Sequence, residues 1–195
     1  MLFRSLDPHR IEIIAQHGGV TWVDDSKATN PHAAASSLSA YPGAIWVVGG
    51  QLKGVDIAPL VAGRGSAVKA AIVIGRTRDD VLAAFARHAP DVPVFEVEHG
   101  ETEEVMRRVV QRAAGIAASG DVVLLAPASA SFDQFSGYAE RGTRFADAVR
   151  EHVGGLETDG THPARDDTQP DRDHEAGETD GDSDADTPPA GGTPA

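Results

Sequence analysis

The sequence predicts an α/β fold with a Rossmann-like, doubly wound and mostly parallel sheet, followed by a disordered acidic tail. Short runs rich in Val and Ile alternate with stretches whose apolar residues recur at helical spacing, which is the pattern of βα units. The alternation covers residues 19–155, a length that holds one such core but not several domains. Right-handed crossovers between parallel strands follow from this order.

Five buried strands are predicted from short apolar runs bounded by glycine or polar residues. They are residues 19–23, 44–48, 70–74, 94–97 and 121–125. Helices fill the gaps between them. The clearest are residues 78–88, with Val81, Leu82 and Phe85 on one stripe, and residues 103–118. Acidic residues at the start of the second of these helices suit the positive end of its dipole.

The two ends of the chain differ from this core. We expect residues 1–18 to form an interdomain linker or hinge, and residues 19–155 to form the folded domain. Residues 156–195 carry 12 acidic and 2 basic side chains, against 18 and 15 in the rest of the chain. This segment has almost no apolar side chain to bury and should be disordered. Its charge favours a solvated tail that increases solubility over a tail that binds a specific partner.

Composition narrows the classes of function. The chain has no cysteine, which excludes disulfides, thiolate nucleophiles and zinc fingers. Its eight histidines are not paired at helical metal-ligand spacing, so no metal site is predicted. No apolar run approaches the roughly 18 residues that cross a bilayer, and the amino terminus does not resemble a signal peptide. We therefore expect a cytoplasmic protein with no membrane insertion and no nucleic-acid partner.

A polar loop follows the first predicted strand. Residues 24–31 read Asp-Asp-Ser-Lys-Ala-Thr-Asn-Pro and place two carboxylates, a lysine and several hydrogen-bonding side chains between a strand and a helix. Open α/β sheets bind ligands at this position, at the carboxyl ends of their strands. Asn30 or Thr29 could instead simply cap the helix, with Pro31 at its first position. Capping does not explain Asp24, Asp25 or Lys27, so we interpret the octet as a binding loop.

A second loop of this kind spans residues 126–133. Its small residues allow close approach of a ligand, and a helix opening near Ser131 would aim free N–H groups at a carboxylate. Ser131 as a helix cap, with Gln134 completing a capping box, explains the same residues. The local pattern does not decide between these two interpretations.

A third loop carries Lys53 behind the glycine pair that ends residues 44–48. A single lysine is usually an ordinary surface residue. Here three loops converge at strand ends, and two lysines with a helix start suit a dicarboxylic amino acid. Trp22, Trp46 and Phe145 lie in apolar patterns, and we interpret them as core residues rather than ligand contacts.

At residues 24–31 the sequence resembles the UDP-N-acetylmuramoyl-L-alanine:D-glutamate ligases, the MurD enzymes of peptidoglycan synthesis. Further matching stretches occur in the order that the family has. They are residues 7–10, 49–54 and 124–135, followed by Arg141, Gly142 and Phe145. The resemblance covers about the first 150 residues, the size of one domain. It concerns only the third, C-terminal domain of those enzymes, which binds the incoming amino acid.

The resemblance implies roles for eight residues. The Lys53 position binds the side-chain carboxylate of D-glutamate, and Thr29 belongs to the same pocket. Ser131 and the backbone N–H of Phe132 bind a carboxylate of the same substrate. Two further positions complete the implied substrate site: Lys27 and the aromatic Tyr138. The implied nucleotide contacts, to ribose and phosphates, are Arg10 at the hinge and Asp25.

The chain contains no Gly-x-x-x-x-Gly-Lys-Ser/Thr phosphate loop, because residues 49–54 lack both its spacing and its hydroxyl. The resemblance implies that a central domain holds ATP and magnesium, and that D-glutamate is added to UDP-N-acetylmuramoyl-L-alanine. We expect this chain to be a separated C-terminal domain, from a split or truncated gene, an alternative start or an expression fragment. It should be inactive alone and need the other ligase domains in cis or in trans. The alternative is a stand-alone, non-catalytic binding module.

Overall fold

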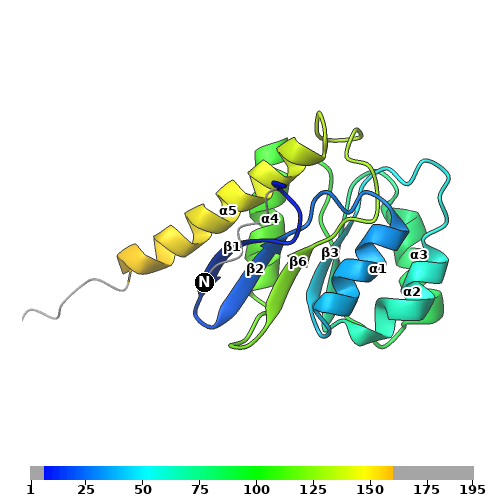
Figure 1. The fold of residues 1–195 in the computed structure, drawn as a ribbon, viewed down its shortest axis with the longest axis horizontal. Coiled ribbons are helices and arrows are strands. Elements are labelled where there is room, and N and C mark those ends of the chain that lie inside the picture. The colour runs from blue at the N-terminus through cyan, green and yellow to red at the C-terminus, as the bar shows by residue number, and fades with distance from the viewer. Residues whose placement is uncertain (1–6, 160–195) are drawn as a thin grey trace, which may run out of the picture. The chain divides into compact units, whose positions relative to one another are not determined.

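The computed structural model describes residues 7–159, which contain six strands and five α-helices (Figure 1). In chain order the elements are β1 (Glu12–His17), β2 (Val20–Asp24), α1 (Pro31–Ala40), β3 (Ile45–Gly49), α2 (Ala58–Arg64), a 3₁₀ turn η1 (Gly65–Ala67), β4 (Ala70–Ile74), α3 (Arg78–His88), β5 (Val94–Glu96), α4 (Thr102–Ala114), β6 (Val122–Leu125) and α5 (Tyr138–Asp159). The doubly wound, mostly parallel α/β fold expected from the sequence is confirmed.

The six strands form one sheet in the order β1-β2-β6-β3-β4-β5. Only β1 runs antiparallel, against β2, and the other pairs are parallel. The last strand in sequence, β6, is thus inserted between β2 and β3. This brings the ends of three sequence-distant segments to neighbouring positions on one edge of the sheet, which is the arrangement that binds ligands in open α/β proteins.

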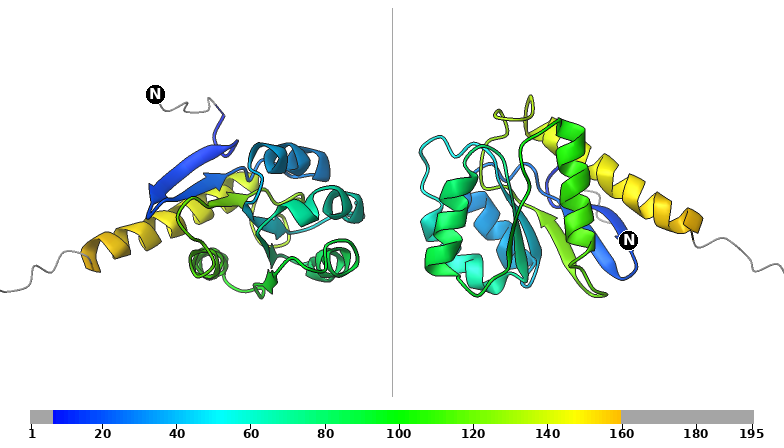
Figure 2. Two further views of the ribbon diagram at one scale, coloured as in Figure 1. Left: turned by 90° about the horizontal axis from the view of Figure 1, so that it is seen from below. Right: turned by 180° about the vertical axis from the view of Figure 1, so that it is seen from behind.

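Helices cover both faces of the sheet because the central strands are apolar on both sides. In β3, Trp46 and Val48 pack into one core with α1, α2 and α3, while Ile45 and Val47 pack into a second core with α4 and α5. The right-hand view of Figure 2 brings α4 to the front, on the face opposite α1. The predicted core aromatics are confirmed, since Trp22, Trp46 and Phe145 are all buried.

The segment expected to be a linker contains the edge strand β1, so that expectation was wrong for residues 12–17. The register of β1 against β2 shifts between Ile13 and Ala15. A β-bulge of this kind disrupts the two-residue alternation by which a strand is recognised in a sequence. The structure therefore extends the folded domain towards the amino terminus.

The carboxyl-terminal boundary also differs from the expectation. Helix α5 continues to Asp159, beyond the expected domain end at residue 155. The remainder of the predicted acidic tail, residues 160–195, lies outside the described residues. Helix α4 ends at Ala114, before the predicted residue 118. Within the described part of the chain, no helix combines the length and the apolar character that crossing a membrane requires.

Candidate functional site

The three polar loops predicted from the sequence follow β2, β3 and β6, which are adjacent in the sheet. The β3 loop leads to α2 on one face, whereas the β6 loop leads to α5 on the opposite face. Two neighbouring parallel strands whose connections leave in opposite directions define a topological switch point. The sequence therefore placed the candidate site at the position that open α/β sheets use.

Main-chain hydrogen bonds join these loops directly. The Ala128 N–H donates to the Ala28 carbonyl at 2.9 Å, which ties the β6 loop to the β2 loop. Gln51 and Ala130 form an isolated antiparallel bridge, with N–O distances of 2.8 and 3.2 Å, which ties the β6 loop to the β3 loop. Because the backbone of each loop is held by another, the side chains they carry start from fixed positions.

Gly50 permits the close approach of the β3 and β6 loops. Its φ is +139°, and a Cβ there would lie 2.4 Å from the Ala130 carbonyl oxygen and 2.7 Å from Ser129 Oγ. Only glycine has both the conformational freedom and the missing side chain that this contact needs. Gly50, the second glycine of the pair at the end of β3, is therefore required for loop packing.

Arg141, in α5, is a buried cation with no exposed surface, and it links two of the loops. Its guanidinium donates to Ser26 Oγ at 2.9 Å, to the Ser26 carbonyl at 2.9 Å and to the Ser129 carbonyl at 3.1 Å. Burial lowers the pKa of Arg141 to about 10, opposed by the charges of Asp133 and Asp24. From the sequence, Arg141 was expected only as part of a stretch that matches the family, without a role of its own. The role of Arg141 depends on the burial of a planar guanidinium that donates three hydrogen bonds, and burial of a single arginine cannot be recognised from the sequence.

Lys53 and Phe132, from the β3 and β6 loops, meet at the site. The Lys53 ammonium lies 4.8 Å from the centre of the Phe132 ring. From the family resemblance, only the backbone N–H of Phe132 was expected to contribute to the site. The structure adds a contact between its side chain and the lysine.

Lys27 and Arg10 share a partner that the sequence analysis did not predict. Both side chains donate to Asp7 Oδ2, and Lys27 also lies 5.7 Å from the centre of the Tyr138 ring. These two cations hold the pKa of the Asp7 carboxyl below its ordinary value, with the Lys27 hydrogen bond as the largest cause. Lys27, Tyr138 and Arg10 therefore form one group around Asp7.

Asp25 is buried rather than directed toward a ligand. It accepts a hydrogen bond from the Ser37 hydroxyl, and burial raises the pKa of its carboxyl. Nearby, the capping interpretation is confirmed for Asn30, whose side chain accepts from the Ala33 N–H at 3.0 Å with Pro31 following at the helix start. Thr29 lies between Asp25 and Asn30 in the sequence, and its N–H donates to the Lys27 carbonyl at 2.8 Å.

The helix expected to open near Ser131 does not form there. The carbonyl of Ser131 accepts from the N–H groups of Gln134 and Phe135, which makes a single turn, and α5 begins only at Tyr138. The capping box is also absent, because Gln134 Oε1 accepts no hydrogen bond from the described residues, while Nε2 of the same side chain donates to the Gly100 carbonyl at 3.3 Å. Asp133 accepts from the Arg76 N–H at 2.6 Å. This single turn is separate from α5, and side chains within it bond to neighbouring loops. Ser131 itself is buried at the site.

The partly buried His9 pairs with the fully buried Asp24, a contact that was not expected from the sequence. His9 Nδ1 lies 2.7 Å from Asp24 Oδ2, and this hydrogen bond raises the pKa of His9. With Glu12 they place three ligand-type atoms within 4.8 Å of one another, a spacing that could hold a metal ion. Each group already has a partner, since Glu12 Oε2 accepts from the His9 N–H and Asp24 Oδ1 accepts from the Ser26 N–H. This network is complete without an ion.

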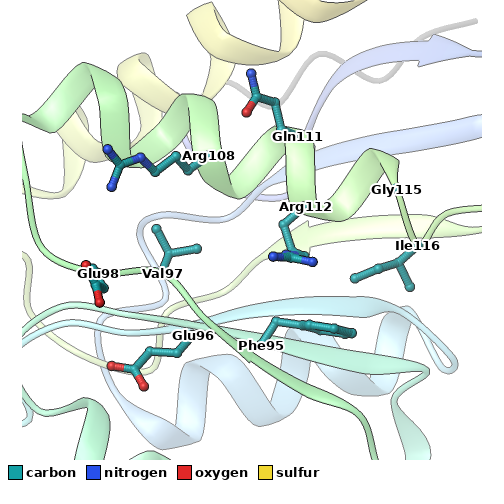
Figure 3. A pocket seen from close by; sticks show the side chains of 9 residues that line it. All are labelled: Phe95, Glu96, Val97, Glu98, Arg108, Gln111, Arg112, Gly115 and Ile116. Carbon is teal, nitrogen blue, oxygen red and sulfur yellow. The ribbon is translucent and has the colours of Figure 1, made fainter.

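A cavity of about 630 Å³ lies away from these loops, between the edge strand β5 and α4 (Figure 3). Its lining carries both charges, with Glu96 and Glu98 on one side and Arg108 and Arg112 on the other. The Arg112 guanidinium lies 5.2 Å from the centre of the Phe95 ring. None of the predicted site residues lines this cavity.

Comparisons with known proteins agree with the resemblance. Residues 9–129 match the family model described as "Mur ligase, glutamate ligase domain". The chain is 55% identical over 160 residues to the UDP-N-acetylmuramoylalanine–D-glutamate ligase of Leifsonia xyli, covering 82% of this chain and 31% of that protein. It is 51% identical over 146 residues to the enzyme of the same name from Frankia casuarinae, covering 75% and 30%.

The chain spans about a third of the length of these curated relatives. A solved structure of UDP-N-acetylmuramate-alanine ligase MurC from Thermotoga maritima aligns with 74% of this chain and 30% of that chain, with a TM-score of 0.46 and 12% identity, which is too distant to support an argument. The family model itself covers more than half of the chain. The chain therefore belongs to the Mur ligase family and corresponds to its glutamate ligase domain.

Proposed function

We propose that this chain is the amino-acid-binding, C-terminal domain of an ATP-dependent ligase that adds D-glutamate to UDP-N-acetylmuramoyl-L-alanine in peptidoglycan precursor synthesis. The observation that carries the proposal is the set of three interlocked loops at the switch point. Backbone bonds and Arg141 hold them together, and they carry Lys53, Ser131 and Thr29. The names of the curated relatives support the choice of substrate.

The chemistry of these loops suits a dicarboxylate. Lys53 offers an ammonium, which forms strong, charge-assisted hydrogen bonds with a carboxylate. Ser131 offers a hydroxyl and Phe132 a backbone N–H, which would hold a second carboxylate. In this role the chain fixes the orientation of the D-glutamate amine, and positioning of a nucleophile is a large part of the catalysis of group transfer.

The proposed cofactors are ATP and magnesium, held mainly by a central ligase domain. ATP would supply the phosphoryl group that activates the carboxyl of the acceptor. Arg10 fits a contact to phosphate, because its side chain is 56% exposed and carries a fixed charge. Asp25 does not fit a ribose contact in the present arrangement, because its carboxylate is buried against Ser37. A nucleotide contact through Asp25 would require that loop to rearrange.

The test is the D-glutamate KM of the complete ligase carrying this domain, with and without Lys53→Ala. Loss of a charge-assisted bond to a carboxylate costs about 1.5–3 kcal/mol, so KM should rise by about one to two orders of magnitude. Lys69→Ala is the matched control, because Lys69 pairs with Asp121, next to the amino-terminal end of β6. An unchanged KM in the Lys53 variant, with the fold intact by circular dichroism, would show that Lys53 is an ordinary surface lysine without a role in D-glutamate binding.

The alternative function, a stand-alone binding module, makes a different prediction. Such a chain would bind D-glutamate but add no ligase activity when it is mixed with the remaining ligase domains. Restored formation of the D-glutamyl product in that mixture would exclude the alternative.

A further inference from the structure

Phe132 is an unusual residue for the rim of a polar site. Its side chain is 65% exposed, among the large hydrophobic residues that the described surface leaves in water. Single exposed apolar residues are common and need no explanation by themselves. This ring, however, faces an ammonium, with Lys53 Nζ 4.8 Å from its centre, which is within the range of a cation–π contact.

The backbone that carries Lys53 forms a hydrogen-bonded turn. The Val55 N–H donates to the Leu52 carbonyl at 3.0 Å, and the two residues between them have φ values of +52° and +78°. These are the features of a type I′ turn, in which the second position favours glycine and is occupied by Gly54. The turn is anchored by the buried side chain of Leu52 and by the bridge between Gln51 and Ala130.

The backbone that carries Phe132 is fixed equally well. Ala130 belongs to the same bridge, Ser131 is buried, and Asp133 accepts the Arg76 N–H at 2.6 Å. Both side chains thus start from hydrogen-bonded backbone, two residues beyond the bridged pair. The rotational freedom that remains is in the long aliphatic side chain of Lys53. Without a contact partner, this flexible chain does not hold the ammonium in a defined position.

We propose that the Phe132 ring is a positioning group for Lys53, holding its ammonium where the side-chain carboxylate of D-glutamate is bound. This inference rests on the proposed function. The ring covers one side of the ammonium and leaves N–H donors on the other side for carboxylate oxygens, since an ammonium has three donors. Binding then does not have to order a freely rotating lysine, whose side-chain entropy is among the largest of the residues.

The contact itself is tested first, without substrate, by NMR of the 195-residue chain with ¹³C-labelled lysine. Lys53 methylene protons next to the ring should show an upfield ring-current shift, assigned by its loss in Lys53→Arg. The shift should disappear in Phe132→Leu and persist in Phe132→Trp, because indole is the better cation–π partner. Val55→Ala, an exposed residue of the same turn, is the control and should keep the shift. A wild-type chain without the shift overturns the proposal.

The role is tested in the complete ligase. Phe132→Leu should raise the D-glutamate KM about two- to fivefold, the effect of a solvent-exposed cation–π contact, with kcat and the ATP KM unchanged. Phe132→Trp should keep the wild-type KM, whereas a ring needed only for packing would not distinguish these variants in this way. An unchanged or lower KM in Phe132→Leu overturns the positioning role, and if Lys53→Ala still raises KM the proposed function stands. An unchanged KM in Lys53→Ala overturns the proposed function and this inference together.

Discussion

Replacing Arg141 by methionine should destabilise the chain strongly, although the side chain keeps a similar length. Arg141 is fully buried in α5 and joins Ser26 and Ser129, which lie in loops more than a hundred residues apart. Methionine can fill the space of the aliphatic stem but donates no hydrogen bond. Two buried carbonyls would then lose the guanidinium as donor.

The size of the loss follows from these partners. A buried carbonyl left without a partner costs about 1–3 kcal/mol, so two of them give an expected loss of about 3 kcal/mol. The Ser26 hydroxyl adds less, because it still donates to the Tyr138 carbonyl at 2.7 Å. The free energy of unfolding of Arg141→Lys should lie between those of the wild type and Arg141→Met. An ammonium keeps the charge but cannot reproduce the planar geometry of three donors.

The assay is urea unfolding followed by circular dichroism, with the free energy of unfolding compared at equal m-values. Arg150→Met is the matched control in the same helix. Arg150 is 59% exposed and forms an ion pair with the equally exposed Asp147, so its loss should change stability by less than about 0.5 kcal/mol. A loss below about 1 kcal/mol for Arg141→Met would refute the view that this residue holds the loops together.

Three further predictions concern the same domain. Gly142→Ala should destabilise the chain, because its Cβ would lie 2.3 Å from His9 Nδ1, whereas Gly154→Ala in the same helix meets no atom within 4 Å and should stabilise by up to about 1 kcal/mol; equal effects in urea unfolding would contradict this. Asp24 raises the pKa of His9, so the pair contributes stability that is fully present below about pH 6.5 and is lost as pH rises through the folded-state pKa. The stability difference between wild type and His9→Gln should therefore be larger at pH 5.5 than at pH 9, and a constant difference would argue against the pair. The 195-residue chain alone should hydrolyse no ATP above background, because its sequence has no phosphate loop, and phosphate release by the purified chain would contradict that.

Local patterns in the sequence were sufficient for most of the fold. The β-branched runs of β3 and β4 are buried on both faces, so they read as strands without tertiary information. Asn30 and Pro31 mark the start of α1 through a cap that involves only residues three apart. The edge strand β1 was missed because its bulge breaks the alternation, and the start of α5 was misplaced because Ser131 resembles a cap.

The sequence by itself also determined where the candidate site lies, because polar loops after buried parallel strands must meet at one edge of the sheet. Only the tertiary structure decided how those loops are joined. The contact of Lys53 with Phe132 and the bonds from Arg141 to Ser26 link residues from 79 to 115 positions apart. Such contacts depend on the order of strands in the sheet, since the insertion of β6 between β2 and β3 brings these loops together. Local sequence patterns report only on neighbours along the chain, and they carry no information about that order.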